Sequence, residues 1–302
     1  MMRVQLAALA LLMAVVPAAA ADETPDATSQ TKTAAGGGQA AASSSLADTA
    51  KQLNNPIGGV WNVVLQNNLT LLKGDISSES QVRWVTNFQP VMPVPVTEDW
   101  NLITRPIIPF VSAPIPQASG GFDREGGVGD ITLQLFASPS ASQGFVWGLG
   151  PVFQFPSASS DALGSEKWSA GPSLVVLNVG KRWVVGGLLT HVQSFAGNGA
   201  RDTVSVSSLQ YFATLLLPNQ WQVGLGTPVI SVNWEASEGN QWTVPIGLSV
   251  GKTVKLGTMP FQMSFETTYA VVHPEFFGER WNFRLILKPV VPALIRKPIF
   301  GS

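Results

Sequence analysis

The sequence predicts an all-β fold, an antiparallel transmembrane β-barrel of about twelve strands, and three observations support it. Charged residues make up only 12% of the 302-residue chain, while hydrophobic residues make up 45%; soluble domains have about 25% charged residues. The chain begins with a short apolar segment of the kind that directs export. From residue 57 onward, apolar and polar residues alternate with a period of two, which indicates strands with one apolar and one polar face.

The first 56 residues are expected to precede the barrel. Residues 1–21 combine Arg3 with an apolar run and small residues up to Ala21, which is typical of a secretory signal peptide. Residues 22–56 are rich in Ala, Gly and Ser, so we expect a disordered or weakly helical linker with one or two helical turns at 46–53. The expected role of this linker is that of a spacer, and the alternative is a plug that enters the barrel.

The predicted barrel covers residues 57–291, and a tail follows at 292–302. Twelve alternating runs can be placed, and ten or fourteen strands remain open. Each run exceeds the roughly 9–11 residues that a tilted strand needs to cross a bilayer. Short turns alternate with longer polar loops such as 112–126, which fits an even number of strands with both termini in the periplasm. The strands are expected near 58–71, 80–93, 98–111, 127–138, 144–156, 167–178, 182–195, 203–217, 220–235, 240–253, 259–272 and 280–290.

Two runs depart from simple alternation. Residues 183–195 are apolar on both faces, and residues 221–235 change phase near Pro228, which suggests a β-bulge. The tryptophans fall near the ends of runs, as expected of the aromatic girdles of a membrane barrel. The periplasmic end is assigned Trp61, Trp100, Trp147, Trp183 and Trp221, and the outer end is assigned Trp84, Trp168, Trp234, Trp242 and Trp281.

The alternation points six charged side chains into the lumen, where charge at membrane depth is tolerated if it is paired or lines water. These candidate lumen-lining residues are Arg83, Arg105, Asp130, Glu266, Arg284 and Lys288. Four cations against two anions leave the expected lumen net positive. The set predicts either a charged constriction that orients or selects solutes, or a salt-bridge network that fills the lumen.

Glu266 and Arg284 are expected to form an ion pair on the lumen wall. Their strands are joined by one loop and must be antiparallel, so the numbers of opposed residues have a constant sum. A loop centred near residue 275 or 276 gives a sum of 550 or 552. The two side chains are then direct or diagonal neighbours, both within reach of long side chains.

The composition excludes several functional classes. With no cysteine, two histidines and a net charge of −1, the chain offers no thiolate chemistry and no basic nucleic-acid surface, and no cofactor or metal is expected. A lipid-facing Ser–His pair is the sharpest enzymatic alternative, yet His191 and Ser194 are three residues apart, so a regular strand points them to opposite faces.

The carboxylates in or beside the outer loops are expected to be solvated rather than ligands of divalent cations; they are Asp123, Glu125, Asp161, Glu166, Glu235, Glu238, Glu275 and Glu279. The chain is therefore not expected to be an enzyme.

Seven segments carry a family resemblance: NLITRPIIP (101–109), GVGDITLQLFASP (127–139), WGLGPVFQFP (147–156), KWSAGPSLVVL (167–177), WVVGGLLTHVQSFAG (183–197), LQYFATLLLP (209–218) and NWEASEGNQWTVPIGLSVGK (233–252). They resemble outer-membrane proteins of the "MetA-pathway of phenol degradation" family, which are often labelled transporters or mislabelled neuromedin U. The resemblance covers roughly residues 55–290. It implies transport across a bacterial outer membrane, with aromatic or other hydrophobic compounds as candidate solutes, and it defines no catalytic motif.

These patterns together predict a porin-like outer-membrane barrel for the passive transport of small solutes. Its expected partners are membrane lipid and a small-molecule solute. A non-transporting structural or adhesive barrel is one alternative, and an outer-membrane lipid hydrolase is the other.

Overall fold

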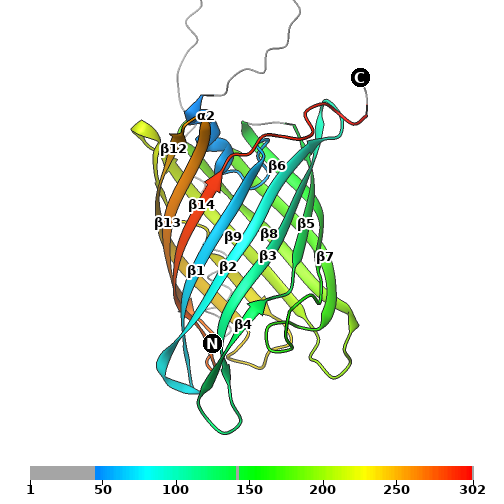
Figure 1. Ribbon diagram of the computed structural model, residues 1–302, viewed down its shortest axis with the longest axis vertical. Helices are drawn as coiled ribbons and strands as arrows, with labels where there is room; N and C mark the ends of the chain where they lie inside the picture. The colour runs from blue at the N-terminus through cyan, green and yellow to red at the C-terminus, as the bar shows by residue number, and fades with distance from the viewer. Residues whose placement is uncertain (1–44, 141–142, 301–302) are drawn as a thin grey trace, which may run out of the picture. The chain divides into compact units, whose positions relative to one another are not determined.

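The computed structural model describes residues 45–140 and 143–300 (Figure 1). The predicted signal peptide at 1–21 and the linker up to residue 44 lie outside these described residues. Within them, one short helix precedes a long series of strands. No helix in the described ranges is long and apolar enough to cross a membrane.

Fourteen strand segments follow the helix α2 (Leu46–Leu53). They are β1 (Asn62–Gly74), β2 (Ser77–Pro95), β3 (Trp100–Pro116), β4 (Phe122–Val128), β5 (Thr132–Pro139), β6 (Gly144–Gln154), β7 (Lys167–Val179), β8 (Trp183–Gly197), β9 (Ser205–Leu216), β10 (Trp221–Gly224), β11 (Val229–Asn233), β12 (Trp242–Leu256), β13 (Met259–Val272) and β14 (Gly278–Pro289). A 3-10 turn, η1 (Pro218–Gln220), joins β9 to β10.

The segments form one closed antiparallel sheet. β1 pairs with β2 on one side and with β14 on the other, so the last strand closes the barrel. β4 and β5 both pair with β3, and β10 and β11 both pair with β9 and β12. Each of these couples is therefore one interrupted wall strand. The fourteen segments make twelve wall strands, which confirms the predicted antiparallel barrel and its strand number.

The interruption between β10 and β11 confirms the bulge predicted near Pro228. β9 pairs Leu216 with Gln222 but Gln210 with Val229, so the register shifts by one residue between them. Proline has no N–H to donate to a ladder. Residues 225–228 leave the regular sheet there, and Thr227 contacts the lumen-facing side chains of Glu266 on β13 and Arg284 on β14.

The predicted loop at 112–126 is mostly strand. β3 continues to its end at Pro116 and β4 begins at Phe122, so the turn is confined to 117–121. Gly120 and Gly121 have φ of 88° and 83° in this turn, a conformation that glycine adopts without strain. The sequence pattern does not predict these strand ends, because a hairpin with water on both faces needs no apolar face and therefore shows no alternation. Conversely, the strand expected at 127–138 is broken between β4 and β5 at 129–131.

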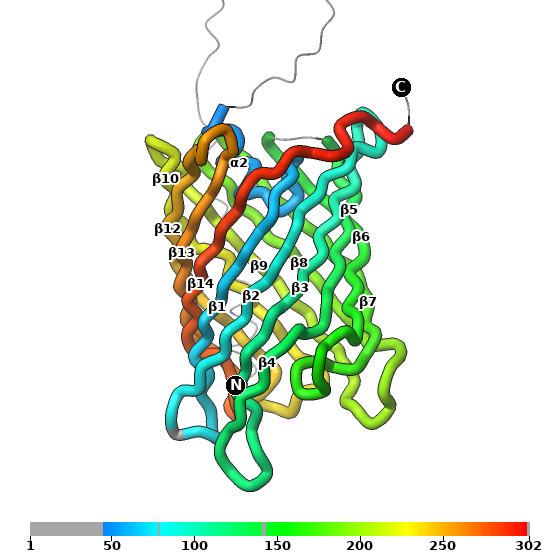
Figure 2. Tube along the Cα trace, viewed as in Figure 1, coloured from blue at the N-terminus to red at the C-terminus, as the bar shows by residue number. Residues whose placement is uncertain are grey.

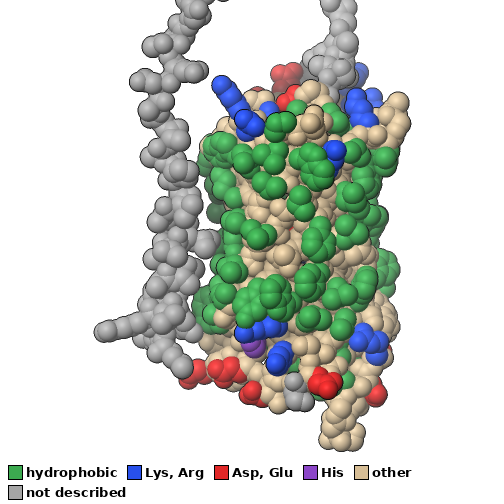
Figure 3. Space-filling view, turned by 90° about the vertical axis from the view of Figure 1, so that its left-hand side faces the viewer, with side chains coloured by type: hydrophobic (Ala, Val, Ile, Leu, Met, Phe, Trp, Pro, Cys, Tyr) green, Lys and Arg blue, Asp and Glu red, His purple; other side chains and the backbone are tan. Residues whose placement is uncertain are grey.

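Side chains alternate between the lumen and the outer wall as predicted. On β13, Ser264 and Glu266 are buried, whereas Met263 and Phe265 are 50% and 48% exposed on the outer face. Figure 3 shows hydrophobic side chains covering the visible wall, with charged side chains gathered at its two ends. This distribution suits a wall whose middle faces hydrocarbon and whose ends face water.

The lumen is not polar all the way round. Inside the barrel lies a cluster of buried apolar side chains, centred on β7 and β8. Val184 and Leu188 point into this cluster, while Val185 and Leu189 of the same strand are exposed on the outer wall. The cluster explains why residues 183–195 are apolar on both faces. Its members are Ile57, Val64, Val91, Ile103, Phe136, Val146, Val175, Leu177, Val179, Val184, Leu188, Phe212 and Ile286.

The two ends of the barrel differ. The end that carries α2 and the C-terminal tail is called the α2 rim, and its turns between strands are short (Figures 1 and 2). The opposite end is called the long-loop rim and carries the connections 155–166, 198–204, 234–241 and 273–277. The predicted alternation of short turns and longer loops is therefore present.

The helix expected at 46–53 is present as α2, and its start is well defined. Ser45 caps it: the Ser45 Oγ atom accepts a hydrogen bond from the Asp48 backbone N–H (3.1 Å) and donates to the Asp48 carboxylate (2.7 Å). The Ser45 hydroxyl, followed by Lys51, holds the pKa of Asp48 below its ordinary value. The opposite face of the helix buries Ala50 and Leu53 against the barrel.

Candidate functional site in the barrel lumen

The centre of the lumen wall is an ion pair between β13 and β14. Glu266 and Arg284 lie directly opposite each other, and the Arg284 Nη1 atom is 3.0 Å from the Glu266 Oε2 atom. Their side chains are only 6% and 10% exposed, respectively. The predicted pair is therefore confirmed, in the register with a sum of 550.

Thr227 completes this pair from the bulge between β10 and β11. Its backbone N–H and its hydroxyl both donate to the Glu266 carboxylate, at 3.1 and 2.9 Å. The Arg284 guanidinium donates in turn to the carbonyl and hydroxyl oxygens of Thr227, at 3.1 and 2.7 Å. The bulge thus gives both charges of the pair additional neutral partners, which a buried ion pair needs.

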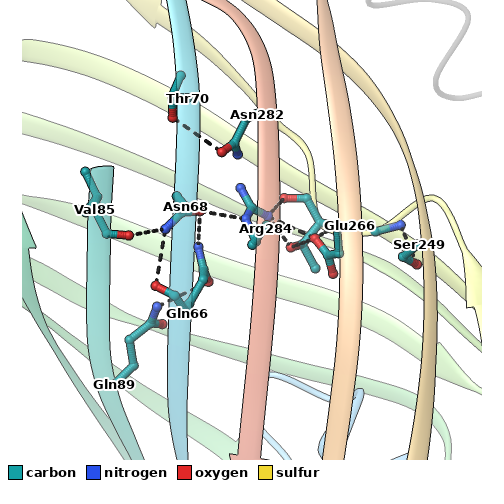
Figure 4. Close-up of polar contacts among 11 residues, drawn as sticks. Gln66, Asn68, Thr70, Val85, Gln89, Ser249, Glu266, Asn282 and Arg284 are labelled. Carbon is teal, nitrogen blue, oxygen red and sulfur yellow. Dashed lines mark hydrogen bonds and ion pairs between the residues drawn. The ribbon is translucent and has the colours of Figure 1, made fainter. Parts of the chain in front are cut away.

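A chain of hydrogen bonds runs from this pair along β14, β1 and β2 (Figure 4). The Arg284 Nε atom donates to the Asn68 side-chain oxygen (2.8 Å). Gln66 donates to the same oxygen, and Gln89 donates to Gln66 (3.1 and 3.3 Å). Arg105 of β3 donates to Gln89 at 2.7 Å and to Gln134 of β5 at 3.4 Å. Polar side chains from β14, β1, β2, β3 and β5 therefore form one continuous stripe inside the barrel.

Two more of the predicted lumen residues lie toward the long-loop rim. Arg83 approaches Glu279, with 3.6 Å between the Nη2 and Oε2 atoms, across the seam that closes the barrel. Asp130 accepts hydrogen bonds from the backbone N–H groups of Ala158 and Ser165 and from the Ser165 hydroxyl. Asp130 therefore fastens the 155–166 loop and is not part of the central polar stripe.

Lys288 holds the N-terminal segment inside the barrel. Its Nζ atom donates to the backbone carbonyl of Leu53, at the end of α2 (2.7 Å). Asn54 donates to Gln222 on β10 (2.8 Å), and Ile57 packs into the apolar cluster. Residues 53–57 thus pack against lumen side chains of the barrel, and the role of the segment 22–56 as spacer or plug stays a prediction.

Two cavities lie along the lumen. The inner chamber, of about 80 Å³, is bordered by residues 53–56 and by side chains that include Arg105, Glu266 and Lys288. The outer vestibule, of about 520 Å³, is bordered by Arg83, Thr268 and Arg284 among others. The Glu266–Arg284 pair contributes one residue to each cavity, so it stands at the boundary between them.

Sequence reasoning placed the polar residues on the inner face but did not single out the amides or Thr227. Gln66, Asn68 and Gln134 fit the alternation, yet nothing marks an amide as a partner of a distant arginine. The apolar lining residues of the inner chamber were also missed, because alternation predicts a polar inner face. These lining residues are Val64, Val91, Phe212 and Ile286.

The structure does not pair His191 with Ser194. Ser194 accepts a hydrogen bond from the Val204 backbone, and His191 instead lies beside Ser207, with 2.9 Å between the Nδ1 and Oγ atoms. Within residues 45–140 and 143–300, no group of three or more His, Asp or Glu side chains could hold a metal ion. Glu166, one of the loop carboxylates, pairs with Arg201.

A closed antiparallel barrel with an apolar outer wall and a polar inner stripe defines an integral β-barrel of the bacterial outer membrane. The chain is similar to the COG4313 outer membrane channel from Pseudomonas putida F1, at 17% identity and a TM-score of 0.55, over 76% of this chain and 93% of that chain.

Two further similar structures are the beta domain of the Bordetella autotransporter Brka and the P. putida toluene transporter TodX. Their TM-scores are 0.43 and 0.39, and their identities are 12% and 10%. The matches cover 77% and 80% of this chain, and 100% and 92% of those chains. A scan against family models and a search of curated proteins return no match. The similarity to the COG4313 structure thus supports the fold, a β-barrel of the outer membrane.

Proposed function

We propose that this protein is a passive channel of the outer membrane for small hydrophobic solutes, aromatic compounds among them. The observation that carries the proposal is the inner chamber, where apolar side chains such as Phe212 and Ile286 stand beside amides and charges. A water-filled porin lumen is polar throughout, whereas an amphipathic lining suits a solute with an apolar body. The resemblance to the phenol-degradation family supports the same solute class.

The proposed path runs from the long-loop rim to the α2 rim. A solute enters the outer vestibule, passes the Glu266–Arg284 pair and reaches the inner chamber, which residues 53–56 border on the far side. The α2 rim is proposed to face the periplasm, in accord with the short turns on that side. Passage then requires the N-terminal segment to move aside.

Solute flux tests the proposal. The purified protein is placed in planar bilayers for conductance and in liposomes for a swelling assay with phenol, hexanol and sucrose. We expect swelling with phenol to exceed swelling with sucrose after the swelling of protein-free liposomes, which phenol also crosses, is subtracted for each solute. No conductance together with no solute-dependent swelling would contradict channel function and would favour a structural barrel.

A crosslink tests whether the lumen is the path. The native chain has no cysteine, so Asn54→Cys combined with Gln222→Cys offers a unique thiol pair at two side chains that are in contact. A short thiol crosslinker should abolish phenol uptake, and either single variant treated in the same way is the control. Unchanged uptake in the crosslinked protein would exclude a path through this end of the lumen.

Surface labelling tests the orientation. Glu238→Cys lies at the long-loop rim and Lys181→Cys in a short turn of the α2 rim, and both native side chains are exposed. On intact cells, a membrane-impermeant maleimide should label the first variant and leave the second unlabelled until the outer membrane is opened. The reverse labelling pattern would show that the α2 rim, and not the long-loop rim, faces the cell exterior.

The hydrolase alternative rests on one specific contact. Trp234 donates a hydrogen bond to the Ser207 Oγ atom (3.0 Å), which leaves the hydroxyl proton free to point to His191. The contacts of His191 in the described structure include no carboxylate or amide that would orient its ring, as catalytic triads require. A phospholipid hydrolysis assay on the same sample, with Ser207→Ala as control, separates the two functions.

A further inference from the structure

The charges of the lumen are not evenly compensated. Arg284 is paired with Glu266, and Arg83 is paired with Glu279. Arg105 and Lys288 differ: within the described residues, neither has a carboxylate oxygen within 4.0 Å of its charged nitrogen atoms. Both border the inner chamber. Among the described residues, the chamber therefore carries two cations that form no ion pair.

The contacts of these two cations are all neutral. Arg105 donates to the side-chain oxygens of Gln89 (2.7 Å) and Gln134 (3.4 Å), and its buried Nε atom has no partner among the described residues. Lys288 donates only to the Leu53 carbonyl among the hydrogen bonds of the described chain. A buried cation is stabilised far better by an anion than by amide oxygens.

The one carboxylate that borders the chamber is already engaged. Glu266 accepts hydrogen bonds from Arg284 and from both the backbone and the hydroxyl of Thr227. Its ion-pair partner is Arg284 at 3.0 Å, and it forms no ion pair with Arg105 or Lys288. The rest of the wall is mixed: Val64, Val91, Phe212 and Ile286 form its apolar part, beside amides and hydroxyls.

We propose that the inner chamber is a binding site for the carboxylate of a small amphipathic acid, which Arg105 and Lys288 hold while the apolar wall contacts the body of the molecule. A guanidinium matches the two oxygens of a carboxylate, and an ammonium adds a second charge-assisted contact. The substrate class is then small aromatic or short aliphatic monocarboxylic acids. This inference rests on the proposed channel, because the lumen is the route to the chamber.

Equilibrium binding to the purified full-length protein in detergent tests the site without requiring transport. Isothermal titration compares benzoate with phenol, benzylamine and inorganic phosphate. We expect benzoate to bind more tightly than phenol, which has the ring without the carboxylate, and benzylamine not to bind. Phosphate should bind more weakly than benzoate, because it gains nothing from the apolar wall.

Variants connect the affinity to the two cations. Arg105→Gln and Lys288→Gln should each weaken benzoate binding by about ten- to a hundredfold, the effect of one charge-assisted hydrogen bond. Arg105→Lys should recover part of the lost affinity, because it keeps the positive charge but not the two parallel N–H donors of the guanidinium. Arg201→Gln removes the same charge from an outer loop and is the matched control. Faster migration of unboiled samples on a gel confirms that each variant forms a barrel.

Several outcomes would overturn the proposal. They are equal affinity for benzoate and phenol, affinity for phosphate as high as for benzoate, and unchanged benzoate binding in both Gln variants. Phenol uptake by liposomes without a preference for benzoate would defeat this inference and leave the channel intact. Benzoate binding without any conductance or uptake would support the site and defeat the channel.

Discussion

The two halves of the lumen wall are built by different rules. On β13 and β14, polar and apolar residues mostly alternate, and the polar inward side chains belong to a hydrogen-bonded stripe that centres on Glu266 and Arg284. On β7 and β8, the inward side chains toward the α2 rim are apolar and packed, as Val175 and Val184 show with no exposure at all. One half thus resembles a porin wall and the other resembles the core of a soluble protein. A barrel of this size can hold both, because twelve strands lie between the filled barrels of eight and the open channels of sixteen.

The largest expected effect on stability comes from disrupting the ion pair of the polar half. Glu266→Gln or Arg284→Gln alone should lower the free energy of unfolding by about 3–5 kcal/mol, because each leaves an uncompensated buried charge. Chemical denaturation in detergent, followed by tryptophan fluorescence, measures this. The double variant should recover part of the loss.

The same pair should also control ion selectivity. Reversal potentials in a salt gradient should shift toward anions for Glu266→Gln and toward cations for Arg284→Gln. Identical reversal potentials in both single variants would show that these residues do not line a conducting path. The salt-bridge network would then be structural only.

The apolar half can be broken with Phe136→Ala. Phe136 has no exposed surface, and truncation of a buried Phe costs about 3–5 kcal/mol in unfolding free energy. Phe145→Ala is the matched control on the outer wall, where the side chain is 64% exposed. Equal destabilisation by the two changes would mean that the inner cluster does not act as a packed core.

The inside and outside of the polar half can be separated by adding a charge. Leu285→Arg places a cation on the lipid face and should cost about 2–4 kcal/mol near the bilayer midplane. Thr268→Arg faces the outer vestibule and should cost far less. A larger effect of Thr268→Arg on the same denaturation curve would invert the assignment of the two faces.

The smallest expected effect concerns the segment that borders the inner chamber. Ser45→Ala removes the cap of α2 and should weaken the helix by about 1 kcal/mol. The readout is maleimide labelling of Ala50→Cys, a site that is 2% exposed, which should be about fivefold faster without the cap. An unchanged rate would show that docking of the segment does not depend on the helix.

The helix also has an expected pH dependence. Because the folded-state pKa of Asp48 is lowered, its contribution is present above its ordinary pKa and is lost as the pH falls through the lowered value. Labelling of Ala50→Cys, divided at each pH by the labelling rate of the exposed Lys181→Cys, should therefore be flat at neutral pH and rise only in acid, because the ratio removes the fall in thiolate common to both. Asp48→Asn should remove that acid-dependent part.

How far the sequence predicts this molecule depends on the range of the interaction. The Glu266–Arg284 pair was predictable because one short loop fixes the register of its hairpin. The approach of Arg83 to Glu279 was not, because β2 and β14 are separated by β1 and by most of the chain. The alternation of polar and apolar residues predicts which positions face the lumen. It does not predict the conformation of the bulge, so it could not show that Thr227 contacts Glu266 and Arg284.

The N-terminal segment shows a second limit. Its composition indicates little intrinsic structure, so it was expected to act as a spacer. In the structure, Leu53 and Asn54 form hydrogen bonds with Lys288 and Gln222, which are far from them in sequence. Such a contact arises only after the barrel exists, so no local pattern near residue 50 could indicate it.

The C-terminal tail has a consequence for assembly. After β14, the chain runs along the α2 rim (Figure 2): Val291 donates to the Trp61 carbonyl, and Ile299 and Phe300 donate to the carbonyls of Pro95 and Val96. The tail thus crosses the β14–β1 seam, where the two ends of the sheet meet. Before the seam forms, the tail is tethered far from these carbonyls, and its effective concentration near them is low. We therefore expect the tail to dock late in assembly, after β14 has paired with β1. Once docked, it spans the β14–β1 seam and opposes the separation of these two strands.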